Sequence, residues 1–394
     1  MSDTMPEQQS PPEKRPTPEP GGGATPIDRL LDKLDRLWKD RKDSSGAFQW
    51  LLKWIRRLLA FTTVAYLVSL CLILLALEYH GEKNLTLCFL LYAPPLGWLL
   101  PLIPLVPLCL LFCPRWALLH IPCVLILLLG YMDYNFTGGS EPSGESLKIM
   151  INNIGQKGKT SLTPFIEREK PDVIALQEAG RGRQYAEAYP LHHVVAVGEF
   201  TLISKYPILD SGFVREANWL GKPAAAWFEI DVNGSPIVIY NIHIPSPRGD
   251  LGKLRGRGLA LGVIGWAGSR LMEVRDRYQE SWNIRMEFAD ALAETIENDP
   301  RPKLAVGDFN MPNHGQVYHR MTRNLSDSFA QSGRGYGFTM PGKTRNPLAL
   351  FGPWMRLDYI LCGEGLRPAN CRVEPDRESQ HRAVVAEIEL APGD

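Results

Sequence analysis

The chain lacks a net charge, since 43 lysines and arginines balance 43 aspartates and glutamates among 394 residues. No overall electrostatic field therefore draws it onto nucleic acid. Cysteine is also scarce, and five of the seven lie within one apolar region, where they are expected to be small buried hydrophobic residues. The other two, Cys362 and Cys371, flank Gly363-Glu364-Gly365. They allow two interpretations: a disulfide, which requires an oxidising compartment, or two free thiols.

Charge is missing altogether from long stretches between residues 58 and 132. Residues 58–77 are uncharged and match the ~20 residues that a helix needs to cross a bilayer. Residues 85–113 are also uncharged but contain five prolines, so they can span only where neighbours or kinks satisfy the freed carbonyls. Residues 116–131 form a shorter third run. We predict a transmembrane region at 58–132 with about three spans; the alternative is two spans with a re-entrant middle segment.

Basic residues indicate the orientation of these spans. Lys53, Arg56 and Arg57 directly precede the first span, and Arg115 lies between the second and third. The positive-inside rule then places the N-terminus in the cytoplasm and, after three crossings, the region beyond Tyr131 outside it. This predicts a multi-pass protein of the cell membrane with an extracytoplasmic domain, whereas two crossings would reverse the side of that domain.

The remaining sequence divides by composition. Residues 1–26 are rich in proline, glutamate and glycine and are expected to be a disordered tail. Residues 27–57 have apolar residues at helical spacing between lysines and arginines, which indicates an amphipathic basic helix, on the membrane surface or packed on a partner. Residues 133–146 are predicted to be a flexible linker, and 147–390 a globular domain.

The globular region mixes strands and helices. Several predicted strands follow one another without a helix between them, which indicates an α/β domain rather than a simple alternating parallel sheet. The predicted strands are 147–152, 172–176, 192–197, 200–204, 236–242, 303–307, 357–361 and 383–389, and the predicted helices include 160–169 and 283–297.

The tetrapeptide Gly307-Asp308-Phe309-Asn310 follows one of these strands. Side chains alternate along a strand, so Asp308 and Asn310 are expected on one face. A carboxylate beside a carboxamide can take a proton from water and hold that water in place. Polar residues also end or interrupt other apolar strands, and Asp358 in particular would be costly to bury without a partner. The others are Asn153, Glu178, His243 and His381.

In their order and spacing, these residues resemble the endonuclease/exonuclease/phosphatase superfamily, which has the deoxyribonuclease-like fold. The resemblance covers roughly residues 147–390 and rests on seven ordered blocks, one of which is 202–208. It implies a four-layer α/β/β/α sandwich, here preceded by transmembrane helices, an arrangement similar to that of membrane-anchored bacterial members.

The resemblance also implies roles for the site residues. Glu178 would be a hard oxygen ligand for Mg²⁺ or Mn²⁺, with Asn153 beside it. Asp308 would activate the attacking water, and Asn310 would hold that water or a phosphate oxygen.

Two histidines would face the phosphate. His381 would contact it while Asp358 fixes the histidine tautomer and favours the imidazolium form, and His243 would be the second. One departure is Gln380, since the family usually has aspartate before the last histidine. Glutamine can accept a hydrogen bond but brings no charge, so we expect weaker or altered metal binding.

Two functional hypotheses follow. The first is a membrane-anchored, divalent-metal-dependent phosphoesterase that hydrolyses a phosphodiester or phosphomonoester, with nucleic acid, phospholipid and small molecules all open as substrates. The second is a catalytically silent module of the same fold that binds phosphate or nucleic acid. Within an apparent insertion at 250–277, Lys253, Arg255 and Arg257 precede the apolar residues 259–266. This segment suits contact with a lipid bilayer or a helical lid.

Overall fold

A computed structural model of the chain describes residues 46–155, 161–216, 218–219, 221–252, 269–342, 352–375 and 377–390. The expected tail at 1–26, most of the expected basic helix and the basic and apolar segment at 253–266 lie outside these residues. The chain divides into two compact units at Leu58 and Leu59, within helix α2 (Gly46–His80). The second unit contains every residue of the predicted site.

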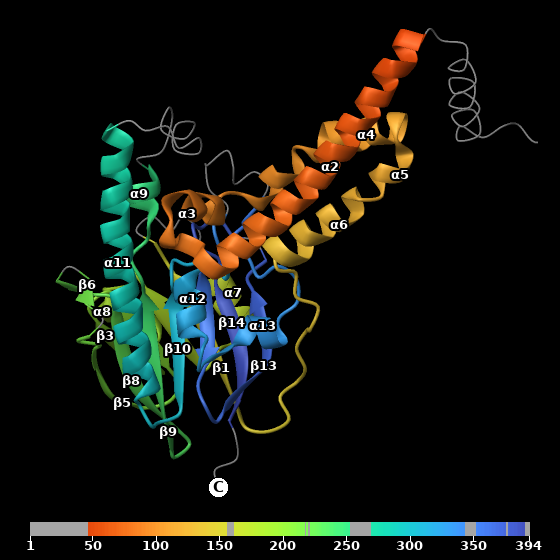
Figure 1. Cartoon of the computed structure of the whole chain (residues 1–394). Coiled ribbons are helices and arrows are strands. Elements are labelled where there is room, and N and C mark those ends of the chain that lie inside the picture. The colour runs from red at the N-terminus through yellow and green to blue at the C-terminus, as the bar shows by residue number, and fades with distance from the viewer. Residues whose placement is uncertain are drawn as a thin grey trace, which may run out of the picture. The chain divides into compact units, whose positions relative to one another are not determined.

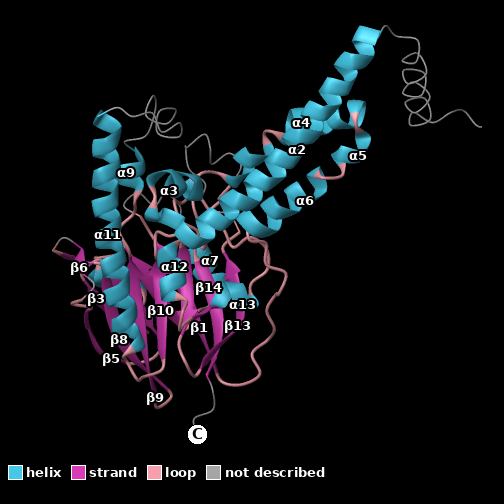
Figure 2. Ribbon diagram, in the orientation of Figure 1, coloured by secondary structure: helices cyan, strands magenta, loops and turns pink. Residues whose placement is uncertain are grey.

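Two mixed six-stranded sheets form the globular domain (Figure 2). The first has the order β13-β14-β1-β2-β4-β3, and the second has the order β11-β12-β10-β9-β8-β5. The first sheet comprises β1 (Ser146–Asn153), β2 (Val173–Gln177), β3 (His193–Val197), β4 (Phe200–Ser204), β13 (Leu366–Val373) and β14 (Val384–Leu390). The second comprises β5 (Ile208–Phe213), β8 (Ala225–Val232), β9 (Ser235–His243), β10 (Lys303–Asp308), β11 (Ser326–Asp327) and β12 (Asp358–Cys362), and the short strands β6 (Asn218–Trp219) and β7 (Lys222–Pro223) pair separately.

The sheets pack face to face because their inward side chains are apolar. Ile149 and Ile151 of the first sheet share one buried core with Phe228 and Ile239 of the second. Helices cover the two outer faces, as Figure 1 shows for α11 along the second sheet. The helices of the domain are α7 (Thr163–Glu169), α8 (Gly182–Ala188), α9 (Arg248–Gly252), α11 (Ser269–Glu297), α12 (Gln316–Met321) and α13 (Ser328–Ser332).

Side-chain packing defines which helix covers which sheet. Met150 of β1 packs with Phe165 of α7, and a neighbouring apolar cluster joins β2 and β4 to α8. On the opposite face, Tyr240 of β9 packs with Leu292 of α11. The order helix, sheet, sheet, helix confirms the predicted α/β/β/α sandwich.

All eight predicted strands are present, with ends that differ by one residue or less. Of the strands that the sequence did not predict, β8 has a clear alternation of buried and half-buried residues, whereas β5 and β13 have weaker patterns. β5 is partly exposed throughout, and β13 contains Pro368 at a register shift, a residue that removes a ladder donor. Helix α11 begins at Ser269 rather than at 283, since its first half is polar and has no clear apolar period.

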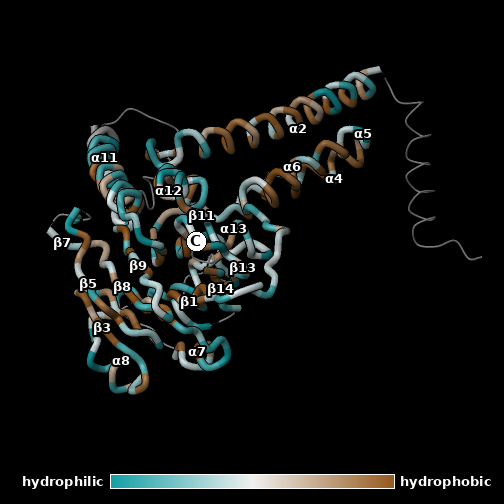
Figure 3. The backbone as a smooth tube through the Cα atoms, turned by 90° about the horizontal axis from the view of Figure 1, so that it is seen from below, coloured by the Kyte–Doolittle hydropathy of each residue, from teal (hydrophilic) through white to brown (hydrophobic). Residues whose placement is uncertain are grey.

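Three helical segments are long and apolar enough to cross a membrane: Gly46–Lys83, Pro95–Phe112 and Pro114–Tyr131. Figure 3 shows the hydrophobic colour of α2, α4 (Leu102–Phe112) and α6 (His120–Leu125) against the hydrophilic colour of much of α11. The remaining elements of this region are η2 (Gly81–Lys83), η3 (Pro95–Leu99), α5 (Pro114–Ala117) and η4 (Ile126–Tyr131).

The apolar run at 85–113 is divided rather than continuous. Its first part forms a separate helix, α3 (Leu85–Tyr92), and Pro94 and Pro95 follow. Proline restricts the residue before it and cannot donate a helical hydrogen bond, so the helix ends there. Leu85 of α3 lies in the same core as α11 and the second sheet.

The segment 133–146, expected to be a flexible linker, is hydrogen bonded to the domain. The Asn135 and Gly335 backbones exchange two hydrogen bonds, at 2.8 and 2.9 Å. Further along, the Ser140 amide donates to Ala369 O of edge strand β13 at 2.9 Å. An edge strand has backbone carbonyl groups that no neighbouring strand bonds to, and the Ser140 amide bonds to one of them.

Cys362 and Cys371 are both buried free thiols. The Cys362 sulfur lies 3.4 Å from the Ser328 hydroxyl. Of the two interpretations left open by their spacing, the structure has the unbridged one.

Candidate active site

Three polar residues form one row across the second sheet. The parallel register pairs Asp308 of β10 with His243 of β9, and the antiparallel register pairs the same Asp308 with Asp358 of β12. Directly paired residues point to the same face of a sheet. The strand register therefore brings together residues that are 65 and 50 positions apart in sequence.

His381 joins this row from the loop before β14. Its Nδ1 lies 2.9 Å from Asp358 Oδ2, and its Nε2 lies 3.7 Å from Asp308 Oδ2. The Thr339 hydroxyl accepts the amide hydrogens of Leu357 and Asp358, at 3.1 and 3.4 Å, which holds the start of β12. The Asp358–His381 pair expected from the sequence is therefore present, and it is buried.

The charges around His381 favour its protonated form. Burial alone would lower the pKa of His381, but the nearby Asp358 and Asp308 carboxylates outweigh it and raise the pKa to about 9. The Asp358–His381 pair thus holds a proton through neutral pH, and its Nε2 edge faces Asp308.

His243 has a similar environment, with a partner that the sequence did not reveal. Its Nδ1 lies 2.8 Å from Glu199 Oε1, and its Nε2 lies 3.8 Å from Asp308 Oδ2. Burial would lower the pKa of His243, but the hydrogen bond with Glu199 and the charge of Asp308 raise it above its ordinary value. Asp308 Oδ2 therefore lies within 3.8 Å of a nitrogen of each of two imidazoles with raised pKa values.

The first sheet contributes Asn153 and Glu178. Asn153 ends β1, and its partner in the register is Gln177, the last residue of β2. Glu178 follows at a φ of 55°, in the left-handed region that residues other than glycine adopt uncommonly.

Asn153 connects the two sheets. Its Nδ2 donates to Asp308 Oδ2 at 2.9 Å and to Glu178 Oε1 at 3.3 Å. Its Oδ1 accepts the Gly155 amide hydrogen at 2.9 Å. Glu178 and Asp308 thus face the same amide from opposite sheets.

The loop after β10 places Asn310. Its backbone amide donates to Asp308 Oδ1 at 2.8 Å, and its Nδ2 donates to Ile244 O at 2.8 Å. Asn310 has a φ of 47°. Glycine is required at position 307, directly before Asp308, because the φ there is 131° and an added Cβ would lie 2.1 Å from Ile242 O.

The donor set fits a hard divalent cation. Asp308, Asp358 and His381 lie with their ligand atoms within 4.8 Å of one another, but protonated His381 has no lone pair to offer an ion, so the oxygen donors are the carboxylates of Asp308 and Asp358 and that of Glu178 beside Asn153. Among the described residues, Asp358 Oδ1 is buried without a hydrogen-bond partner. Carboxylate and carbonyl oxygens are the ligands that Mg²⁺ and Mn²⁺ prefer, so the chemistry of this cluster matches such an ion.

Gln380 is exposed, and within the described part of the chain no hydrogen bond joins its side chain to the cluster. Its loop is held instead by residues that the sequence analysis missed. Arg377 Nη2 donates to Asn152 Oδ1 at 2.8 Å, and Arg377 Nε donates to Glu374 at 2.8 Å. No local pattern marks Arg377, Glu199 or Thr339, because each acquires its role through contacts distant in sequence.

Two hollows lie outside the row of side chains. One, of about 950 Å³, adjoins Glu178 and is lined by Arg181, Tyr185 and Tyr189 among others. The second, of about 590 Å³, contains none of the predicted site residues.

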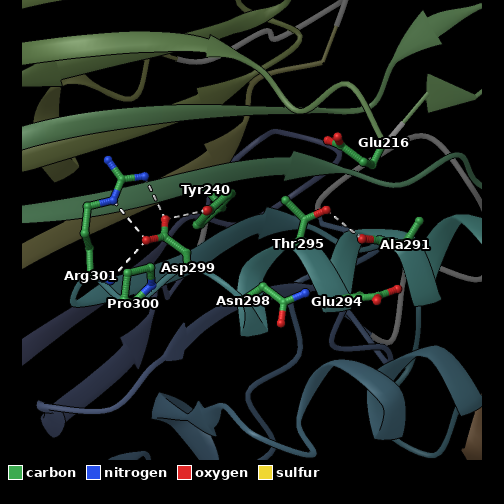
Figure 4. A pocket seen from close by; sticks show the side chains of 9 residues that line it. All are labelled: Glu216, Tyr240, Ala291, Glu294, Thr295, Asn298, Asp299, Pro300 and Arg301. Carbon is green, nitrogen blue, oxygen red and sulfur yellow. Dashed lines mark hydrogen bonds and ion pairs between the residues drawn. The ribbon is translucent and has the colours of Figure 1, made fainter.

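Figure 4 shows this second hollow, where Asp299 bonds with Tyr240 and Arg301. Burial would raise the pKa of Asp299, but hydrogen bonds from Arg301 and Tyr240 lower it to about 2. These paired groups have a structural role.

Comparison with known proteins identifies the class. The model of the endonuclease/exonuclease/phosphatase family matches residues 152–381. This match covers more than half of the chain, and the chain belongs to that family, whose members hydrolyse phosphate esters. The matched range begins one residue before Asn153 and ends at His381.

Several solved structures are similar at low identity. An endonuclease/exonuclease/phosphatase from Bacteroides vulgatus is 17% identical, with 63% of this chain and 100% of that chain covered and a TM-score of 0.45. A mannosyl-6-phosphatase from Bacteroides thetaiotaomicron is 15% identical over 62% and 100%, with a TM-score of 0.43. A 3′ phosphatase from Neisseria bound to a product DNA hairpin is 16% identical over 62% and 100%, with a TM-score of 0.41. No curated protein matches the sequence.

Proposed function

We propose that this protein is a membrane-anchored, divalent-metal-dependent phosphoesterase. The observation that carries the proposal is the position of Asp308, whose Oδ2 lies 2.9 Å from Asn153 Nδ2 and within 3.8 Å of both His243 and His381. A carboxylate that lies between two imidazoles, beside a proposed metal site, can act as a base, and the imidazolium groups and the metal ion can bind one phosphate.

The roles follow from charge and geometry. The imidazolium groups of His243 and His381 would bind the phosphate oxygens, with Asp358 fixing the orientation of His381. Asp308 would take the proton of the attacking water, since its carboxylate is buried and already accepts hydrogen bonds from the Asn310 amide and Asn153. Asn310 would orient that water or a phosphate oxygen through its side chain.

The Glu178 carboxylate would bind Mg²⁺ or Mn²⁺, with Asn153 beside it and bonded to it through Nδ2. When bound, such an ion neutralises charge on the phosphate as it is attacked. Gln380 brings no further carboxylate to this site, which supports a weaker affinity for the metal than an aspartate would give.

The membrane anchor is supported by the three long apolar helices. Residues 78–92, which run from the end of the first candidate span to just before the second, contact the catalytic domain through a hydrogen bond of 2.7 Å from the Tyr92 hydroxyl to Asn310 O. If this segment and the catalytic domain lie on the same side of a bilayer, the second and third candidate spans are the two crossings between residue 92 and residue 133. The basic residues Lys53, Arg56 and Arg57 then favour a cytoplasmic N-terminus and an extracytoplasmic catalytic domain.

The hollow beside Glu178 supports a substrate with an organic group on its phosphate. Its lining combines Tyr185, Tyr189 and aliphatic residues with Arg181, a mixture that binds an amphiphilic or ring-containing group near an anion. The absence of a net charge in the sequence favours a small or lipid-linked phosphoester over a long nucleic acid.

The test uses the full chain in lipid nanodiscs with bis-p-nitrophenyl phosphate and p-nitrophenyl phosphate. Turnover should require Mg²⁺ or Mn²⁺, disappear with a chelator, and be lost in Glu178→Ala and in His381→Ala. Asp210→Asn, an exposed change on β5, should leave turnover unchanged. Phosphate binding without turnover at any metal concentration would instead identify the silent binding module. DNA, RNA and phospholipids compared under the same conditions would then define the substrate.

A further inference from the structure

One segment between the candidate spans belongs structurally to the catalytic domain. Residues 78–92, which we call the inter-span segment, run from the end of α2 through η2 and α3. Its Leu85 and Cys88 are buried in the core that also contains Tyr278 and Trp282 of α11. In Figure 1, α3 lies beside α11 at the same ends of the strands that carry the site.

The first half of this segment is bonded to the residues just beyond the catalytic loop. Glu82 is buried, its Oε2 accepts the Gln316 amide hydrogen at 2.7 Å, and its backbone oxygen accepts the Tyr278 hydroxyl. Glu78 lies 3.0 Å from His314 Nδ1, and its backbone oxygen accepts Gln316 Nε2 at 3.0 Å. These contacts hold the segment against residues 314–316.

The second half reaches the catalytic loop itself. The Tyr92 hydroxyl donates to Asn310 O at 2.7 Å. The Trp354 indole donates to Tyr92 O at 3.2 Å, which fixes Tyr92 from the other side. Burial raises the pKa of Tyr92 well above its usual range, so the phenol keeps its proton and remains a donor.

Several hydrogen bonds hold Asn310 in the site. It has a φ of 47°, a left-handed conformation that asparagine tolerates well, and its Nδ2 donates to Asp308 Oδ2 at 3.2 Å. Asp308 binds its amide hydrogen, Ile244 binds its side chain, and Tyr92 binds its carbonyl. Of these three, Tyr92 alone comes from outside the globular domain.

We propose that Tyr92 is a positioning residue for catalysis, which acts by holding the carbonyl of Asn310 so that the Asn310 side chain stays beside Asp308. The inter-span segment is then a working part of the active site as well as a connection between membrane helices. The proposal rests on the proposed function, because it assigns Tyr92 a role through Asn310. A side chain displaced by ~1 Å can cost a large factor in rate, so the effect belongs to kcat rather than to substrate binding.

The test is Tyr92→Phe in the full chain in nanodiscs. We expect kcat to fall about 10-fold while KM changes less than about 2-fold, since the Tyr92 hydroxyl is bonded to the Asn310 carbonyl and would act through Asn310. Tyr66→Phe is the matched control, because it removes another phenol-to-carbonyl bond, to Trp98 O, far from Asn310 in the membrane region. It should keep the wild-type kcat.

Two further variants separate positioning from stability. Tyr278→Phe loosens the same segment at Glu82 without touching the loop of Asn310, so it should lower Tm as much as Tyr92→Phe does but lower kcat less. Trp354→Phe should reproduce a smaller part of the Tyr92→Phe loss, because it loosens Tyr92 alone.

A double-mutant cycle with Asn310→Ala tests whether Tyr92 acts through the Asn310 side chain. If Tyr92 acts through the Asn310 side chain, Tyr92→Phe should have no further effect on kcat in the Asn310→Ala background. Additive losses, or a wild-type kcat in Tyr92→Phe, would overturn the proposal. A wild-type kcat in Asn310→Ala would instead overturn the role of Asn310 in the proposed function, so the two failures are distinguishable.

Discussion

The two sheets contribute to the active site in different ways. The second sheet places His243, Asp308 and Asp358 in one row by strand register, and hydrogen bonds across the ladder fix their spacing. The first sheet contributes Asn153 at a strand end and Glu178 just beyond one, the latter in a left-handed conformation. The proposed base Asp308 and the proposed phosphate-binding His243 thus lie on strands of the second sheet, whereas Asn153 and Glu178, proposed for the metal site, lie where strands of the first sheet give way to loops. Substitutions in the two sheets should therefore fail differently.

The largest effect is expected from Asp308→Asn, at the centre of the row. Loss of a general base lowers the rate by about 10³-fold. The apparent metal affinity should stay nearly unchanged, because Asp308 belongs to the second sheet. Steady-state kinetics over a Mn²⁺ titration measures both, with Asp210→Asn as the control; a large shift in the Mn²⁺ midpoint would show that Asp308 is a metal ligand instead.

Gly307→Ala tests how firmly the row depends on its backbone. The new Cβ would lie 2.1 Å from Ile242 O at a φ of 131°, so we expect a loss of about 3 kcal/mol in stability, measured as a lower Tm. Gly365→Ala is the matched control, since that glycine has a φ of 77° with nothing within 4 Å. It should cost only about 1 kcal/mol. Equal costs would contradict the close approach at Gly307.

Glu178→Gln tests the other sheet. We expect activity at a fixed low Mn²⁺ concentration to fall about 100-fold. High Mn²⁺ should restore part of it, because the substitution weakens ion binding and leaves the His243–Asp308–Asp358 row intact. An unrecoverable loss at every metal concentration would remove the distinction between the sheets.

The charged state of His381 predicts a pH dependence of stability. Its pKa in the folded protein is about 9, above its unfolded value, so the stabilisation is complete below pH ~6.5 and is lost as pH rises through ~9. With a chelator present, wild type should exceed His381→Gln in Tm by about 5 °C at pH 6.5. The difference should shrink toward pH 9.5, and a difference that is constant with pH would contradict the buried charged pair.

The smallest effect is expected from Gln380→Asp, which restores the residue usual in the family. Gln380 is exposed, so an added carboxylate acts through screened charge and should strengthen Mn²⁺ binding only about 3-fold. Gln380→Asn, which stays neutral, is the control. Stronger Mn²⁺ binding in both variants would show that the size of the side chain, rather than its charge, determines the metal affinity.

The site was predictable to the extent that strand patterns carried it. Asp308, Asp358 and His243 end or begin apolar runs, which marks them as polar residues at strand ends; the register that pairs them across three strands was not predictable from those runs. Glu199 and Arg377 were missed because their positions have no pattern of their own; Glu199 meets His243 only where the turn between β3 and β4 approaches the end of β9. Tyr92 was placed within a single apolar run, since hydropathy does not distinguish a helix in lipid from a helix packed on a protein core.

Residue order alone determined the α/β class, eight of the strands, the apolar helices and the chemical types in the site, because each of these is a local property of side-chain period or composition. Tertiary structure alone decided that Asp308 stands between two imidazoles, that Asn153 joins the sheets, and that Tyr92 reaches Asn310. Those contacts join residues as much as 218 positions apart, and such pairings depend on register and packing, which no short stretch of sequence encodes.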